Sequence, residues 1–101
     1  DVVVLRSGRW LLVHNNAERG RHRLALSLSE DEGRTWRPAR YLERDDRGMG
    51  PATASYPSII QARDGSIHVS YTYTAAEAEV KLDTEGRRLR EGIRHRRFTE
   101  A

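Results

Sequence analysis

The chain of 101 residues has no cysteine and no long hydrophobic run. Without cysteine there is no disulfide framework and no thiolate metal site, and the redox compartment stays undetermined. No apolar run approaches the ~18 residues of a membrane-spanning helix. A positive leader with a cleavage site is also missing, so residues 1–5 predict a strand and not a signal peptide. Localisation is therefore left open.

Hydrophobic residues are also few, at 37% against 33% charged residues. This balance is polar for a chain that closes its own core, and the length suits one domain but not two. The apolar residues form short runs, a pattern typical of strands packed against neighbouring strands. Because the chain also lacks an initiator methionine, we expect it to be a piece of a longer protein.

The net charge is +3, and arginine far outnumbers lysine. The arginines are scattered among acidic residues except in one cluster near the C-terminus. That cluster lacks interleaved aromatic residues, zinc-ligand spacing and a recognition-helix pattern, so we interpret it as a solvated edge strand and predict no nucleic-acid partner. The cluster comprises Arg87, Arg88, Arg90, Arg94, Arg96 and Arg97.

The segment from Ser29 to Trp36 fits the pattern S-x-D-x-G-x-T-W at every specified position. Ser29 and Asp31 are short polar side chains that hydrogen-bond the amides of tight turns. Gly33 supplies a positive φ without a Cβ penalty. Thr35 resumes extended geometry, and Trp36 offers a large ring to cover the turn. We expect a structural turn here, in which Asp31 is not a catalytic acid.

Apolar and polar residues alternate along most of the chain, which predicts an all-β fold of two units with roughly four strands each. Asp64-Gly65 between alternating runs predicts a hairpin, with His68, Ser70 and Thr72 on one face of its second strand. Residues 75–92 are less regular, and we expect a hairpin excursion there. The predicted strands cover residues 2–5, 10–13, 24–29, 37–42, 56–61, 67–73 and 93–98, with loops at 15–20 and 43–53.

The turn at Ser29 resembles an Asp-box, the hairpin turn that recurs in sialidase-type β-propellers. Further motifs follow the order seen near the end of proteins of the sialidase (neuraminidase) superfamily that carry BNR repeats. The resemblance implies about two blades of a six-bladed β-propeller, with residues 1–101 as the C-terminal part of one propeller domain. The motifs that carry it are Leu11–Asn16, an arginine-bearing loop, the Asp-box, Ser55–Ser58, Asp64-Gly65 and the ending from Ile93 to Ala101.

The resemblance also implies two functional residues. Tyr56 falls where sialidases place their nucleophilic tyrosine, and Arg21 falls where the third arginine of the substrate-carboxylate triad lies. Arg19 and Arg23 are close alternatives to Arg21. Sialic acid carries a carboxylate on its anomeric carbon, so a neutral tyrosine avoids the repulsion that an anionic nucleophile meets. Arginine suits the carboxylate because its planar fork donates two parallel hydrogen bonds. Pro57 departs from the small polar residue usual in sialidases.

The function implied is an exo-glycosidase that hydrolyses terminal sialic acid or a related acidic sugar, with no cofactor. The acid/base aspartate, the activating glutamate and two more arginines lie in earlier blades of the family. We therefore expect this chain to be inactive alone. Two alternatives stay open: a non-catalytic propeller that binds glycans or proteins, and a polysaccharide lyase in which Tyr56 is a base toward a uronic acid. The oligomeric state is not determined.

Other polar and aromatic residues have structural interpretations. The four histidines are not spaced as a metal-binding set, so no metal is predicted. Asp45 and Asp46 lie in a charged loop, where we expect exposure to solvent. Trp10 and Trp36 are interpreted as packing between blades and not as platforms for sugars.

Overall fold

The computed structural model describes residues 1–17, 19–46, 51–76, 81–82, 88–89 and 91–100. Every regular element in these residues is a β-strand, so the predicted all-β class is confirmed. The strands are β1 (Val2–Val4), β2 (Trp10–His14), β3 (Arg23–Ser29), β4 (Arg37–Arg44), β5 (Thr53–Gln61), β6 (Ile67–Thr74), β7 (Lys81–Leu82), β8 (Arg88–Leu89) and β9 (Glu91–Phe98).

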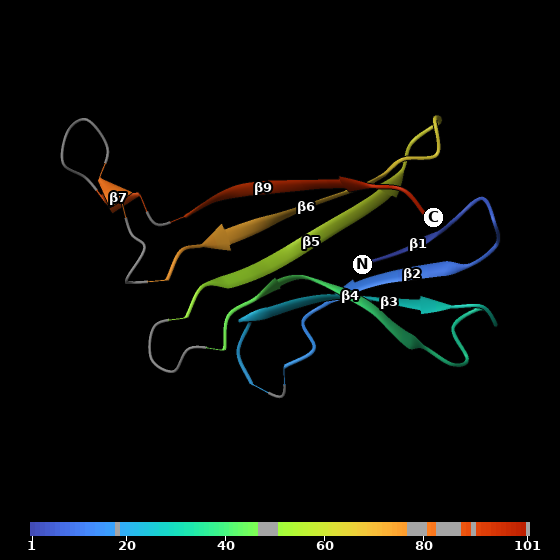
Figure 1. Cartoon of the computed structure of the whole chain (residues 1–101), viewed down its shortest axis with the longest axis horizontal. Coiled ribbons are helices and arrows are strands. Elements are labelled where there is room, and N and C mark those ends of the chain that lie inside the picture. Colours follow the sequence, from blue (N-terminus) through green and yellow to red (C-terminus); the bar gives the residue numbers. More distant parts are fainter. Residues whose placement is uncertain (18, 47–50, 77–80, 83–87, 90, 101) are drawn as a thin grey trace.

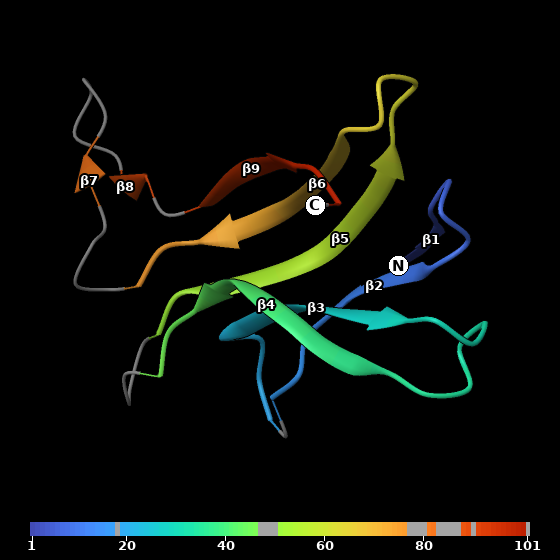
Figure 2. The same ribbon diagram turned by 45° about the vertical axis from the view of Figure 1, so that its right-hand side comes forward.

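Seven of these strands form two antiparallel sheets, which Figure 1 shows one above the other. The first sheet has the order β1-β2-β3-β4, and the second has the order β5-β6-β9. The arrangement is consistent with propeller blades. Four strands per unit is right for the first sheet, whereas the second has three strands. The predicted excursion contains the short β7–β8 ladder, which lies beyond one end of the second sheet (Figure 2).

The hydrophobic core lies between the two sheets. Its strands follow the predicted alternation in β6, where Ile67, Val69 and Tyr71 are buried while the residues between them are partly exposed. In β3 the alternation is incomplete, because Ala25 and Ser29 are buried as well. Burying an aliphatic side chain contributes roughly 1.5–3 kcal/mol, so this shared core is the main attraction between the sheets. The core comprises Leu5, Leu11, Val13, Leu24, Leu26, Ala54, Ile59, Ile67, Val69 and Tyr71.

The connection predicted over residues 43–53 is shorter than expected. β4 continues to Arg44, and β5 begins at Thr53. The predicted start of β5 at Tyr56 was wrong because a bulge interrupts the alternation at that point. The carboxylate of Asp45 accepts a hydrogen bond from the backbone N–H of Ala52 at 2.8 Å, which fastens the end of the connection to its beginning.

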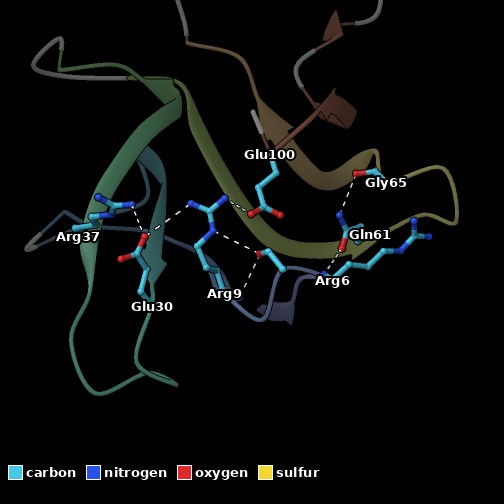
Figure 3. A network of polar contacts seen from close by, with 8 residues as sticks. Arg6, Arg9, Glu30, Arg37, Gln61, Gly65 and Glu100 are labelled. Atoms are coloured by element: carbon cyan, nitrogen blue, oxygen red, sulfur yellow. Dashed lines mark hydrogen bonds and ion pairs between the residues drawn. The ribbon is translucent and has the colours of Figure 1, made fainter.

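A polar network joins the β1–β2 turn to the C-terminal residues (Figure 3). The guanidinium of Arg9 forms an ion pair with Glu100 and lies 3.9 Å from the carboxylate of Glu30. The backbone N–H of Arg6 donates to the side chain of Gln61 at 2.8 Å. Four segments far apart in the sequence therefore meet at this end of the two sheets.

β9 is the edge strand of the second sheet and is largely exposed, as the charge cluster predicted. The guanidinium groups of Arg94 and Arg96 are not merely solvated, however. Both donate hydrogen bonds to Glu43 of β4 in the first sheet. Arg87 and Arg90, which belong to the same predicted cluster, lie outside the described residues.

Candidate active site

Tyr56 lies in a β-bulge of β5. The pairing of β5 with β6 is interrupted between Ser55 and Ser58, so Tyr56 and Pro57 have no partner residue on β6. The φ of Tyr56 is 52°, in the left-handed region, and its side chain is 75% exposed. A bulky residue adopts this backbone only where its surroundings impose it, and bulges commonly re-aim a side chain beside an active site.

Arg21 lies in the loop between β2 and β3, and its guanidinium stacks on the ring of Tyr56. The guanidinium carbon is 5.0 Å from the ring centroid, within the range of a cation–π contact. The backbone N–H of Ala54 donates to the carbonyl of Arg21 at 2.8 Å, which ties the loop to β5. The two site residues suggested by the resemblance come from opposite sheets and meet in the structure.

The alternative arginines occupy different places. Arg23 donates from Nε to Asp46 at 2.8 Å, and this hydrogen bond is the main cause of its raised pKa. Arg44 binds the same carboxylate at 2.6 Å. Asp46 is exposed, as predicted, although it is engaged in ion pairs. Arg19 is exposed, and among the described arginines it is Arg21 that stacks on Tyr56.

The Asp-box turn is closed by its own side chains. Ser29 is 1% exposed; its Oγ accepts the N–H of Gly33 and donates to Asp31, both at 2.8 Å. The hydroxyl and backbone N–H of Thr35 donate to Asp31 at 2.5 and 2.8 Å. The hydroxyl of Thr35 is the main cause that lowers the pKa of Asp31 to about 2. Asp31 is thus an ionised acceptor within the turn, and this state does not suit a general acid.

A comparison with known protein families gives a match that includes strands of both sheets. The family model of the BNR repeat-like domain matches residues 1–69 of the 101. The chain belongs to the BNR repeat-like domain family. The match spans the first sheet, β5 and the beginning of β6, so it includes both Arg21 and Tyr56. BNR repeat domains occur in sialidases and in other propeller proteins. Comparison with curated proteins and with solved structures found no significant match.

A second tyrosine of this BNR repeat domain has an acidic partner that the sequence did not indicate. The hydroxyl of Tyr71 donates to the carboxylate of Glu43 at 2.5 Å and accepts from Nε of Arg96 at 3.1 Å. Arg94 and Arg96 donate to the same carboxylate oxygen at 2.9 and 3.1 Å. No periodic signal marks Glu43, because the contact is made between sheets.

The ionisation of this cluster follows from its burial. Burial by itself raises the pKa of Glu43, but hydrogen bonds from Tyr71, Arg94 and Arg96 outweigh burial and lower it. Burial and then the Glu43 carboxylate raise the pKa of Tyr71. Tyr71 is 1% exposed and is held protonated, so its arrangement suits a structural bridge and not a nucleophile.

The two tryptophans of the BNR repeat domain lie beside the Asp-box turn. A Cβ built on Gly33 lies 3.0 Å from the six-membered ring of Trp10 and 3.6 Å from that of Trp36, so both indoles lie against the Asp-box turn. Neither belongs to the core between the two described sheets. Trp10 pairs with Ser29 and therefore lies on the face of the first sheet opposite the core residue Leu11.

Two histidines meet on the second sheet. Nδ1 of His68 lies 2.8 Å from Nε2 of His95, across the β6–β9 pairing. Among the described residues, no group of three or more potential ligands is placed to hold a metal ion. The part of the chain that the structure describes also has no helix long and apolar enough to cross a membrane.

Proposed function

We propose that this chain is the C-terminal part of a sialidase-like exo-glycosidase with a six-bladed propeller, which removes terminal sialic acid or a related acidic sugar from glycans. The observation that carries the proposal is the contact between Arg21 and the ring of Tyr56, a residue that is 75% exposed in a left-handed backbone conformation. Membership of the BNR repeat-like domain family supports it.

Tyr56 is the proposed nucleophile. Its hydroxyl oxygen attacks the anomeric carbon and forms a tyrosyl–glycosyl bond while the bond to the leaving oxygen breaks. The phenol proton passes to a base, and the leaving oxygen takes a proton from an acid. Free tyrosine ionises only near pH ~10, so a base is required at neutral pH. No carboxylate of the described residues hydrogen-bonds the Tyr56 hydroxyl, and we propose that base and acid belong to earlier blades.

Arg21 is the proposed carboxylate ligand. The carboxylate of sialic acid is bonded to the anomeric carbon, so the group that binds the carboxylate must lie close to the nucleophile. The 5.0 Å separation of the Arg21 guanidinium from the Tyr56 ring meets this requirement. We propose that the donors of Arg21, whose guanidinium lies over the Tyr56 ring, bind the substrate carboxylate. A bidentate pair with the substrate carboxylate fixes orientation as well as affinity.

The test is hydrolysis of a fluorogenic sialoside by the full-length protein. The Tyr56→Phe variant is expected to lose turnover by at least about a thousandfold with an unchanged melting temperature, because only the nucleophilic oxygen is removed. Arg21→Lys is expected to raise KM by roughly tenfold, since the planar fork is lost. Tyr41→Phe, at an exposed tyrosine of β4, is the matched control and should retain activity.

Full activity in Tyr56→Phe contradicts the assignment of the nucleophile. If the wild-type protein cleaves no sialoside, two further assays separate the alternatives. Formation of an unsaturated product from a polyuronate identifies a lyase with Tyr56 as base, and binding of acidic glycans without turnover identifies a binding propeller.

A further inference from the structure

Asn15 directly follows β2 and links the two segments that carry the proposed site. Its side-chain nitrogen donates one hydrogen bond to the carbonyl of Arg23 at 2.8 Å and a second to the carbonyl of Ala54 at 2.9 Å. Arg23 begins β3 in the first sheet, and Ala54 belongs to β5 in the second. Both hydrogens of one amide group therefore join the two sheets.

The backbone at this junction requires such a donor. The N–H of Ala54 donates directly to the carbonyl of Arg21 at 2.8 Å. Beside this bond, the backbone carbonyls of Arg23 and Ala54 both point at the side-chain amide of Asn15, and both carbonyls are acceptors. Two carbonyls do not bond each other, and partly buried carbonyls without a donor are unfavourable. The two hydrogens of the Asn15 amide satisfy both carbonyls and hold them at a fixed separation.

We propose that Asn15 is a positioning residue that sets the contact between Arg21 and Tyr56. The carbonyls that it binds belong to residues two positions after Arg21 and two positions before Tyr56. A change in their separation moves the guanidinium relative to the ring. The inference rests on the proposed function only for its catalytic consequence, and the geometric part is tested without substrate.

A second set of hydrogen bonds at this junction is expected to keep the protein folded when the Asn15 side chain is replaced. The backbone N–H of Asp45 donates to the carbonyl of His22 at 2.9 Å, and the carboxylate of Asp45 accepts from the N–H of Ala52 at 2.8 Å. These bonds also join the loop before β3 to the beginning of β5. Loss of the Asn15 amide is therefore expected to loosen the junction and not to separate the sheets.

The geometric test uses the full-length protein with 3-fluorotyrosine at position 56. The fluorine resonance reports the guanidinium on the ring, and Arg21→Ala defines its position when the guanidinium is absent. Asn15→Ala is expected to move the resonance at least about halfway to that position, with native circular dichroism. The matched control is Asn16→Ala, because Asn16 donates to the hydroxyl of Tyr41 at 3.1 Å and not to this junction. It should leave the resonance in place.

A wild-type fluorine resonance in folded Asn15→Ala overturns the proposal, as does an equal displacement in Asn16→Ala. If Asn15→Ala does not fold, Asn15→Ser replaces it, because serine keeps a single short donor. The Ser variant is then expected to displace the resonance partway, and an undisplaced resonance overturns the proposal equally.

The catalytic readout separates this inference from the proposed function. If the wild-type protein hydrolyses a sialoside, Asn15→Ala is expected to lower kcat/KM by about 10–100-fold, because a displacement of about 1 Å at a reacting group has that order of effect. Asn16→Ala should retain kcat/KM. A protein that hydrolyses neither a sialoside nor a glycoside of a related acidic sugar contradicts the proposed function, while the fluorine resonance still decides the role of Asn15.

Discussion

Tyr71 and Tyr56 both lie beside arginines, but in opposite environments. Tyr71 is 1% exposed and donates to the carboxylate of Glu43 at 2.5 Å. Tyr56 is 75% exposed, and the guanidinium of Arg21 lies over its ring. Tyr71 lies in β6 and pairs regularly with β9, whereas Tyr56 has a positive φ and lies in the bulge of β5 that is opposite Tyr71.

Tyr71 belongs to a structural polar cluster, whereas Tyr56 belongs to the candidate site. At Tyr71, the hydroxyl and the Glu43 carboxylate are bonded to each other and to Arg94 and Arg96, so little capacity remains for a ligand. No buried side-chain polar atom of the described residues lacks a partner. At Tyr56 the hydroxyl and the Arg21 guanidinium face solvent, and the backbone holds a strained conformation. The exposed side chain and left-handed backbone of Tyr56 are the reasons that we propose it, and not Tyr71, as the functional tyrosine.

The largest effect on stability is expected at the Tyr71 cluster. Glu43→Ala is expected to lower the free energy of unfolding by about 2–3 kcal/mol, because Tyr71, Arg94 and Arg96 lose their common acceptor. Urea denaturation of the wild type and the variant measures this difference in the free energy of unfolding. Glu30→Ala is the control, since the Glu30 side chain is 60% exposed, and its effect should stay within about 0.5 kcal/mol. Equal losses in the two variants would show that the Tyr71 cluster does not join the sheets.

Acid should weaken the same cluster. Hydrogen bonds lower the pKa of Glu43 below its ordinary value of 4.5 in spite of burial, which acts in the opposite direction. The stability from its ionised form is thus present above that pH and is lost as the pH falls through the lower folded-state pKa. Urea denaturation at a series of pH values should give a shallower loss below pH 4.5 in Glu43→Gln than in the wild type. Parallel profiles would contradict this role of Glu43.

The smallest change in the free energy of unfolding is expected at Tyr56, where glycine and alanine should show the reverse of their usual order of stability. Glycine in a strand is ordinarily less stable than alanine by about 0.5–1 kcal/mol, but a left-handed backbone reverses the order. Tyr56→Gly should therefore be more stable than Tyr56→Ala by about 1 kcal/mol in chemical denaturation. The matched pair at exposed Ser58 of the same strand should show the ordinary order. The ordinary order at both positions would show that Tyr56 is unstrained.

Much of the fold could be predicted from local patterns. Alternation in β6, the Asp64-Gly65 turn and the Asp-box each depend on residues close in sequence, and the structure contains all three. The prediction failed where local geometry broke the pattern. The bulge at Tyr56 interrupts the alternation, so the start of β5 was predicted three residues too late.

The candidate site was predicted in part. The resemblance suggested Tyr56 and Arg21, but spacing alone left Arg19 and Arg23 open as alternatives. The ion pair of Arg23 with Asp46 distinguishes it from Arg21, and this is a contact between residues far apart in the sequence. Asn15 was not identified, because an asparagine after a strand carries no signal for the carbonyls that it will bind.

The sequence by itself determined the strands, the Asp-box turn and the BNR repeat character, because hydrogen bonds and side-chain periodicity within a hairpin depend on neighbouring residues. Only the tertiary structure decided which arginine meets Tyr56, which tyrosine is buried on Glu43, and which amide joins the sheets. Those contacts depend on how two sheets pack and on where a bulge shifts the register, and neither is encoded within a single hairpin.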